Sequence, residues 1–175
     1  GRPINALTTA FTNLGKGYAG PIPVPVIIFA IVALISWFFL AKTQFGRYIY
    51  AIGGNEKAAL VSGLRVKQLK FLSYVINGMT AALAGILLAA RVAVGSPTAG
   101  ESYDLLAITA VVVGGTSNAG GTGGILPSII GVFIVTVMNN GMDLLGISGY
   151  YQKIVTGVVV LLAVIIDRNN VNRNH

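Results

Sequence analysis

The sequence predicts an all-α membrane protein, a polytopic bundle with about five transmembrane crossings. Hydrophobic residues make up 54% of the 175 residues, charged residues make up only 10%, and the mean hydropathy is +0.78. Soluble domains carry about 25% charged residues. Several uncharged runs are also long enough to cross a bilayer as helices. The net charge of +7 does not indicate nucleic acid here, because in a membrane protein its distribution over the loops matters more than its sum.

Two spans are clear from the sequence, residues 24–41 and 71–90, and both lack ionisable side chains. Three shorter or glycine-interrupted candidates follow, at residues 105–117, 125–141 and 150–166. Because a crossing helix needs about 20 residues, the 105–117 segment could instead be a re-entrant piece. The number of crossings therefore depends on this segment.

The basic residues indicate the orientation. Eight of the twelve Lys and Arg lie in a central loop or in the tail: Lys42, Arg47, Lys57, Arg65, Lys67, Lys70, Arg168 and Arg173. By the positive-inside rule both regions are cytoplasmic, which requires an even number of crossings between them. Counting all four later segments satisfies this, so we expect an external lead-in (1–23), a cytoplasmic loop (42–70) and a cytoplasmic tail (167–175).

The lead-in is polar and ends in the run GPIPVP, where alternate prolines favour an extended backbone up to the membrane. The chain opens at Gly1 without a methionine or a leader, so we expect a piece of a longer protein. Aromatic residues at the span ends, such as Trp37 and Tyr150, suit the membrane interface.

The segment 46–70, GRYIYAIGGNEKAALVSGLRVKQLK, has the pattern of a short capped helix. Asn55 suits the N-cap, Glu56 suits the first turn, and Gly63 can end the helix after Ser62. Gly53 and Gly54 would let the backbone turn sharply just before it. Such a helix would present Ala58, Ala59 and Ser62 as a small-residue surface for another protein. The residues alone leave open an ordinary basic loop.

Three motifs carry a family resemblance: GRYIYAIGGNEKAALVSG, PTAGESYDLLAITAVVVGGTSNAGGTGG and NNGMDLLGISGYYQKIVTGVVVLLAVIID. Together, over about residues 24–167, they resemble the carboxyl-terminal half of the permease subunit of bacterial ABC importers for ribose, xylose, galactose and arabinose. Family permeases are nearly twice this length, so the resemblance implies half of a transport subunit in the bacterial cell (inner) membrane. It implies a permease that moves a pentose or hexose into the cytoplasm by alternating access.

The resemblance also implies a docking element. In the family, the matching loop carries a coupling helix that docks in a groove of the cytoplasmic ATPase. By position, the docking residues are Gly54, Asn55, Glu56, Ala58, Ala59, Ser62 and Gly63. The shorter E-A-A-x-x-x-G signature of ABC importers matches only loosely, because Lys57 stands where that signature has its glutamate.

The implied partners are the ATPase, a periplasmic or lipid-anchored sugar-binding protein, a second permease copy in a homodimer, and membrane lipid. The resemblance implies no nucleic acid, and it places ATP and Mg on the ATPase, with no cofactor on this chain.

Glycine-rich segments have a packing role and no nucleotide role in this prediction. Ala81, Gly85 and Ala89 recur every four residues, a pattern typical of close helix packing. The run GGTSNAGGTGG (114–124) resembles a phosphate-binding loop in its glycine spacing, but Gly121 stands where the phosphate-binding Lys belongs. We expect a tight turn on the cytoplasmic side, close to the partner surface.

Two groups of polar residues are candidates for the sugar pathway. Thr98, Glu101 and Tyr103 could line the outer mouth or meet the sugar-binding protein, although solvation at the interface also explains them. Asn139 and Asn140 could bind sugar hydroxyls or form hydrogen bonds between helices.

Enzyme chemistry lacks its parts in this sequence. The only histidine is His175, there is no cysteine, and the five acidic residues are scattered, so we expect no catalytic or metal site. Two other classes stay open. A secondary transporter or channel would use intramembrane charges, which the clear spans lack, and a non-transport scaffold would use its basic loop to hold anionic lipid.

Overall fold

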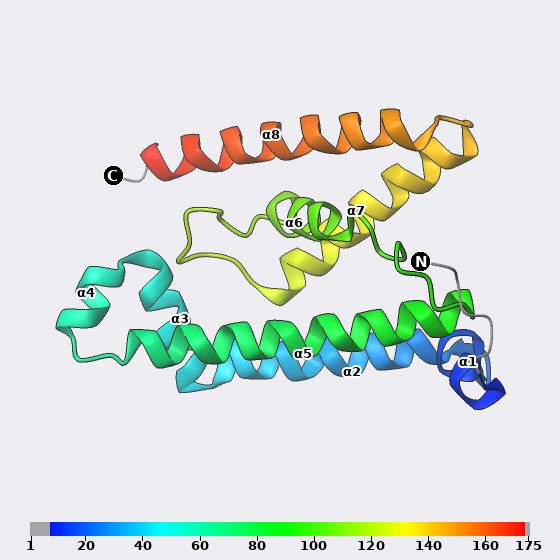
Figure 1. Cartoon of the computed structure of the whole chain (residues 1–175). Coiled ribbons are helices and arrows are strands. Elements are labelled where there is room, and N and C mark those ends of the chain that lie inside the picture. Colours follow the sequence, from blue (N-terminus) through cyan, green and yellow to red (C-terminus); the bar gives the residue numbers. More distant parts are fainter. Residues whose placement is uncertain (1–7, 174–175) are drawn as a thin grey trace. The chain divides into compact units, whose positions relative to one another are not determined.

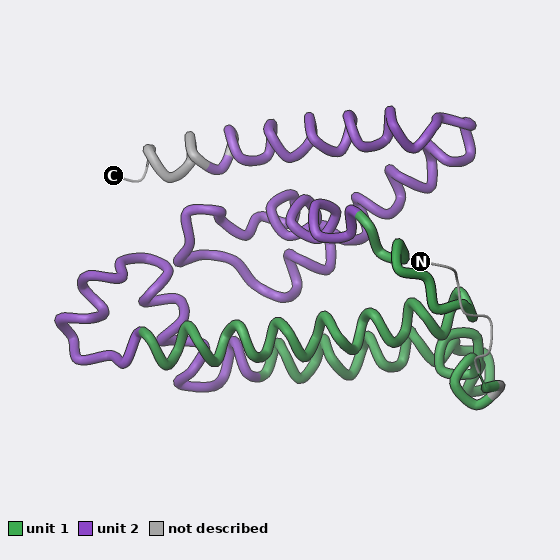
Figure 2. Tube along the Cα trace, in the orientation of Figure 1, with its two compact units in different colours: residues 1–38, 67–101 green, residues 39–66, 102–175 purple. Residues whose placement is uncertain are grey.

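The structure, a computed structural model, describes residues 8–173. Figure 1 shows its helices, and Figure 2 shows the two compact units into which they fall. Unit 1 holds residues 1–38 and 67–101, and unit 2 holds residues 39–66 and 102–175. The all-α prediction is confirmed. Residues 1–7 of the predicted lead-in and 174–175 of the predicted tail, with His175, lie outside the described residues.

Unit 1 begins with structure that the sequence did not predict. Helix α1 (Thr9–Lys16) is followed by a two-stranded antiparallel hairpin, β1 (Tyr18–Ala19) and β2 (Ile22–Pro23). The backbone is extended only to Pro23, because helix α2 (Val24–Lys42) starts at the next residue. Pro25 fits in this first turn, where a missing N–H removes no helical hydrogen bond.

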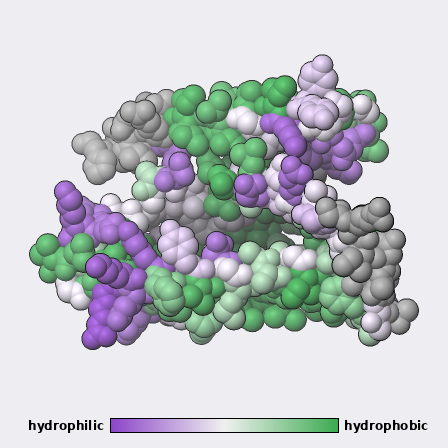
Figure 3. Space-filling view, viewed as in Figure 1, coloured by the Kyte–Doolittle hydropathy of each residue, from purple (hydrophilic) through white to green (hydrophobic). Residues whose placement is uncertain are grey.

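Among the described residues, three helices are long and apolar enough to cross a membrane: α2, α5 (Val66–Val92) and α7 (Ile125–Leu144). Within α2 no residue is buried, and Figure 3 shows apolar residues over much of the face in view. An apolar helical surface of this kind suits lipid, because every backbone polar group is satisfied inside the helix. The part of the chain that the structure describes is therefore a membrane bundle without a conventional apolar core in unit 1.

Unit 2 holds α3 (Gln44–Gly54), α4 (Glu56–Val61), α6 (Tyr103–Val113), α7 and α8 (Gly149–Arg173). Helix α6 packs against both α7 and α8. The α6–α7 contact is made by backbone: Gly131 lies so close to the Ala110 carbonyl oxygen that a Cβ would not fit. Thr109, 0% exposed, and Val135, 4% exposed, lie in the packed region.

Helix α6 corrects the predicted span at residues 105–117. It has 11 residues and therefore rises about 16 Å, about half of a hydrocarbon core of about 30 Å. The helix ends at Val113 because two glycines follow, and Gly115 has a φ of +92°. A continuous helical span over 105–117 is wrong, and the crossing of this segment stays a prediction.

Helix α3 was not predicted, and it changes the role of two glycines. Gly53 and Gly54 are the last residues of α3, so the prediction that they form a sharp turn is wrong. The chain instead changes direction at Asn55, which has an extended backbone between the two helices. The signal for α3 was present in Thr43, a good N-cap residue whose oxygen accepts a hydrogen bond from the Gly46 N–H.

Candidate functional site

Helix α4, the candidate docking helix, is capped at both ends. Asn55 has φ −156° and ψ 100°, and its side-chain oxygen accepts a hydrogen bond from the Ala58 N–H at 3.0 Å. Glu56 lies in the first turn, where its negative charge stabilises the helix dipole. At the other end the Ser62 hydroxyl donates to the Ala58 carbonyl at 2.9 Å, and Gly63 has a φ of +80°. The predicted N-cap and end of this helix are confirmed.

Six of the seven candidate docking residues are exposed: Gly54, Asn55, Glu56, Ala58, Ser62 and Gly63. Ala59 is only 5% exposed, so its predicted place on the outer surface is wrong. The reason is helix geometry, because neighbouring residues point about 100° apart. The face that carries Ala58 and Ser62 therefore turns Ala59 inward.

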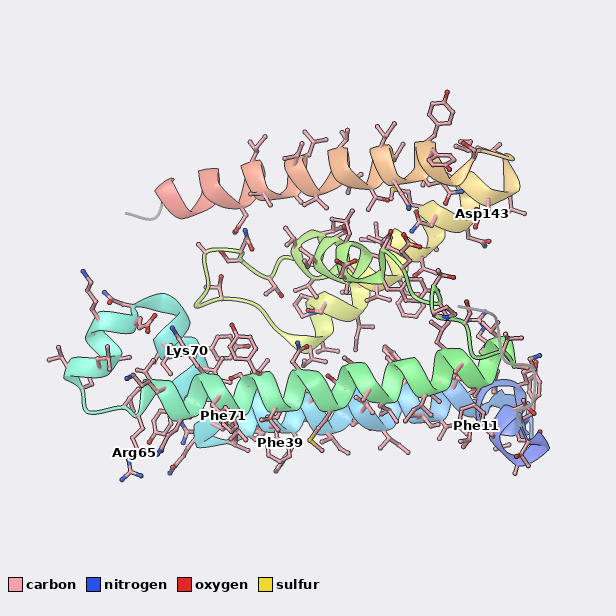
Figure 4. The ribbon with its side chains drawn as sticks, viewed as in Figure 1. Phe11, Phe39, Arg65, Lys70, Phe71 and Asp143 are labelled. Carbon is pink, nitrogen blue, oxygen red and sulfur yellow. The ribbon has the colours of Figure 1, made fainter. Side chains whose placement is uncertain are left out.

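Two apolar side chains of α4 were missed by the sequence analysis. Val61 is 91% exposed and Leu60 is 54% exposed. The signal that could have found them is the presence of two apolar residues side by side in a loop predicted to lie outside the membrane. Lys57 lies in the helix and Arg65 follows it, and Figure 4 shows Arg65 projecting from the loop after α4. The end of unit 2 around α4 therefore combines small, apolar and positively charged groups.

Helix α3 packs against α4 and also contacts a loop that is distant in the sequence. The Tyr50 hydroxyl on α3 donates a hydrogen bond to the Gly123 carbonyl at 2.8 Å. Gly123 belongs to the glycine loop (residues 114–124), which connects α6 to α7. The predicted turn is therefore present, and it contacts the helix that leads into α4.

The glycine loop and α3 touch through bare backbone. A Cβ on Gly53 would lie 2.6 Å from the Gly121 nitrogen, and a Cβ on Gly120 would lie 2.6 Å from the Gly53 oxygen. Atoms cannot approach this closely without a shift of the backbone. Only glycine at these positions permits the observed contact.

The opposite side of the glycine loop is bound to α8. The carboxylate of Asp167 accepts a hydrogen bond from the Ser117 hydroxyl at 2.8 Å and another from the Asn118 N–H at 3.0 Å. The glycine loop thus joins the end of α3 to the end of α8. Asp143, in the last turn of α7, lies at the other end of unit 2 from Arg65 (Figure 4). The location of the central loop and the tail on one side of the membrane stays a prediction.

Comparison with known proteins places this chain in a family. Residues 3–164 match the family model described as "Branched-chain amino acid transport system / permease component". The chain belongs to this permease family. The resemblance drawn from the three sequence motifs is thereby confirmed, and the chain is a multi-pass protein of the cell (inner) membrane.

Individual relatives of this permease-family chain are sugar permeases. It is 51% identical over 170 residues to the ribose import permease protein RbsC of Bacillus subtilis, covering 96% of this chain and 53% of the relative. It is 48% identical to the ribose import permease protein RbsC of Escherichia coli, over 95% of this chain and 53% of the relative. It is 45% identical to the xylose transport system permease protein XylH of Haemophilus influenzae, over 85% of this chain and 40% of the relative.

The chain spans about half the length of the curated ribose permeases that it matches. No solved structure matches it.

The candidate pathway residues of this permease fall into separate places. Thr98 and Glu101 share one turn of unit 1, in which the Glu101 N–H donates to the Thr98 carbonyl at 3.2 Å. Tyr103 starts α6 and is 55% exposed. Asn139 is half-buried on α7 and Asn140 is exposed. These positions are compatible with pathway or mouth lining, which stays a prediction for all five residues.

Proposed function

We propose that this chain is the carboxyl-terminal half of the permease subunit of an ATP-binding cassette importer that moves a monosaccharide, a pentose or a hexose, into the cytoplasm. Membership of the permease family and similarity to the ribose and xylose permeases support the class of transporter and of substrate. The observation that carries the proposal is α4, a helix capped at both ends, exposed along one face and held by α3.

In the proposed mechanism, α4 is the element that receives mechanical work. The ATPase closes on ATP and displaces α4, and the bundle reorients so that the sugar site opens to the other side. The permease provides the path and no chemistry, while ATP and Mg bind to the separate ATPase. The exposed Leu60 and Val61 favour docking, because burying apolar surface of this size stabilises a complex by roughly 25 cal/mol per Å².

The proposed assembly contains two copies of the full-length permease, two ATPase sites, and an external sugar-binding protein, periplasmic or lipid-anchored. The exposed apolar faces of α2 and α5 leave room for lipid and for further helices. Close contacts between such helices are made by packing rather than by the hydrophobic effect.

Transport by the reconstituted system tests the proposal. The full-length permease, its ATPase and its sugar-binding protein are placed in proteoliposomes, and uptake of radiolabelled ribose and xylose is measured. We expect uptake that requires ATP hydrolysis and that stops with a non-hydrolysable ATP analogue.

The controls separate the competing functions. An ionophore that collapses ion gradients has no effect on the proposed importer, whereas it abolishes uptake by a secondary transporter. Uptake that persists without ATP hydrolysis contradicts the proposal. A complete absence of uptake with an active ATPase and a loaded binding protein also contradicts it, and then favours a membrane scaffold.

A further inference from the structure

The glycine loop contacts both the helix leading into α4 and Asp167 near the far end of α8. Its contact with α3 is steric, through Gly53, Gly120 and Gly121. Its contact with α8 is polar, through Asp167. Neither contact is needed for the loop merely to connect α6 to α7. The pair of contacts therefore indicates a second role for the loop.

The loop is internally braced, so that a push at one side reaches the other. The Ser117 N–H donates to the Thr122 carbonyl at 3.1 Å, and the Gly120 N–H donates to the Ser117 carbonyl at 3.2 Å. The Ser117 hydroxyl also accepts a hydrogen bond from the Ala119 N–H at 3.2 Å. Ser117 itself is only 8% exposed. These bonds hold Ser117 at a fixed distance from the two glycines that touch α3.

Asp167 provides the hydrogen-bond acceptor in the contact between the glycine loop and α8. One oxygen of its carboxylate, Oδ2, accepts both hydrogen bonds from the loop. Hydrogen bonds to an ionised acceptor are about twice as strong as those between neutral groups. Both donors belong to neighbouring residues at one corner of the loop, so the carboxylate fixes the position of that corner relative to α8.

We infer that Asp167 is a positioning residue: its carboxylate fastens the glycine loop to the end of α8, so that displacement of α4 passes through the loop to α8. This inference rests on the proposed function, in which an ATPase displaces α4. Displacement enters the loop at Gly53–Gly121, where the backbones are already in contact and cannot approach further. It leaves the loop at Ser117, which Asp167 holds. Without the carboxylate, the loop can yield and α8 stays behind.

The test is the number of sugar molecules taken up per ATP hydrolysed, measured with the full-length permease, ATPase and sugar-binding protein in proteoliposomes. For Asp167→Ala we expect hydrolysis to continue and the ratio to fall about three-fold or more, since a hydrogen bond to a charged group shifts a two-state equilibrium by about ten-fold. Ser117→Ala lowers the ratio less, because the Asn118 bond remains. Asp167→Asn retains an acceptor oxygen and recovers part of the ratio, because its neutral amide accepts weaker hydrogen bonds than the carboxylate.

The matched control is Asp143→Ala. Asp143 also accepts a side-chain hydrogen bond, from the Gln152 amide at 2.6 Å, but at the other end of unit 2. We expect it to keep the wild-type ratio. A ratio that falls equally in Asp143→Ala and Asp167→Ala overturns the inference, because the effect would then follow from any loosened helix end.

A second variant tests the other contact of the loop. Gly53→Ala places a methyl group against the Gly121 backbone, whereas Gly149→Ala meets nothing within 4 Å. We expect Gly53→Ala, and not Gly149→Ala, to lower the ratio. If both loop contacts lie on one path, the ratio of uptake to hydrolysis in the double variant Gly53→Ala/Asp167→Ala is no lower than in the more impaired single variant. A fully multiplicative fall overturns the shared path.

Failure of the inference differs from failure of the proposed function. A wild-type complex that couples uptake to hydrolysis, beside an Asp167→Ala complex with the same ratio, overturns the inference alone. The inference alone also fails if uptake and hydrolysis fall in proportion and Asp167→Asn gives no rescue, which marks Asp167 as merely structural. A wild-type complex without ATP-dependent uptake overturns the proposed function and the inference with it.

Discussion

The two units differ in how much of their apolar helices is buried. In unit 1, helices α2 and α5 are long and apolar, and no residue in the most apolar 18-residue stretch of either helix is buried. In unit 2, helix α6 is short, yet it contains Thr109 at 0% exposure and Ala110 at 4%. Apolar character therefore does not identify the packed part of this membrane protein. Close backbone contact at glycine marks the packed places in both units, at Gly131 against Ala110 in unit 2 and at Gly15 against Arg91 in unit 1. Such contact joins helices when lipid is as apolar as the side chains.

The largest expected effect is at the α6–α7 contact. Gly131→Ala sets a methyl group against the Ala110 carbonyl oxygen, so the two helices must separate. We expect a destabilisation of about 3 kcal/mol, measured as the thermal unfolding midpoint of the detergent-solubilised full-length permease. Gly85→Ala in α5 is the control, since a Cβ there meets nothing within 4 Å; it should change stability by no more than about 1 kcal/mol.

The Gly85 control can also break the contrast. If Gly85→Ala is as damaging as Gly131→Ala in the full-length permease, another helix covers this face of α5. The contrast between the units would then hold only for the residues of this chain.

A smaller effect comes from two threonines that make the same bond in different surroundings. The Thr109 hydroxyl donates to the Leu105 carbonyl at 2.6 Å in the packed α6, and the Thr80 hydroxyl donates to the Ile76 carbonyl at 3.1 Å on the exposed α5. Thr109→Ala should destabilise by about 1.5 kcal/mol, from a cavity and a lost bond. Thr80→Ala should stay within about 0.5 kcal/mol of wild type. Equal effects would contradict the difference in burial.

The smallest effect is local to α4, which belongs to unit 2 but is held mainly by its caps. Asn55→Ala removes the hydrogen bond to the Ala58 N–H and should cost about 1 kcal/mol, confined to this helix. Hydrogen exchange at the Ala58 amide measures it, and we expect faster exchange there with no change in α7. Asn55→Asp keeps a capping oxygen and should restore protection. Faster exchange throughout unit 2 would mean that α4 is part of the packed region.

The features that the sequence predicts correctly depend on residues that are close together in the chain. The Asn55 cap, the end of α4 near Gly63 and the uncharged span starting at Val24 all follow from residues a few positions apart. The bond between Asp167 and Ser117 could not be predicted in this way, because the two residues are 50 positions apart and nothing in either local sequence indicates the other as its partner.

Two misses have a common physical cause. Gly53 and Gly54 were expected in a turn because glycine favours turns, yet they lie in α3 since Gly53 must touch Gly121. Ala59 was expected outside because it is small, yet it packs inward. In both cases tertiary contact overrides the local preference of the residue.

The central claim is that α4 docks on an ATPase, and crosslinking tests it most directly. The 175 residues contain no cysteine. In a full-length permease from which any other cysteine has been removed, a single cysteine carrying a short photoreactive crosslinker reports on one position. With the ATPase present, Ala58→Cys should capture it efficiently and the buried Ala59→Cys poorly. Tyr150→Cys, at a position 82% exposed at the start of α8, should not capture it at all. No capture from Ala58→Cys, or equal capture from Tyr150→Cys, would contradict the account.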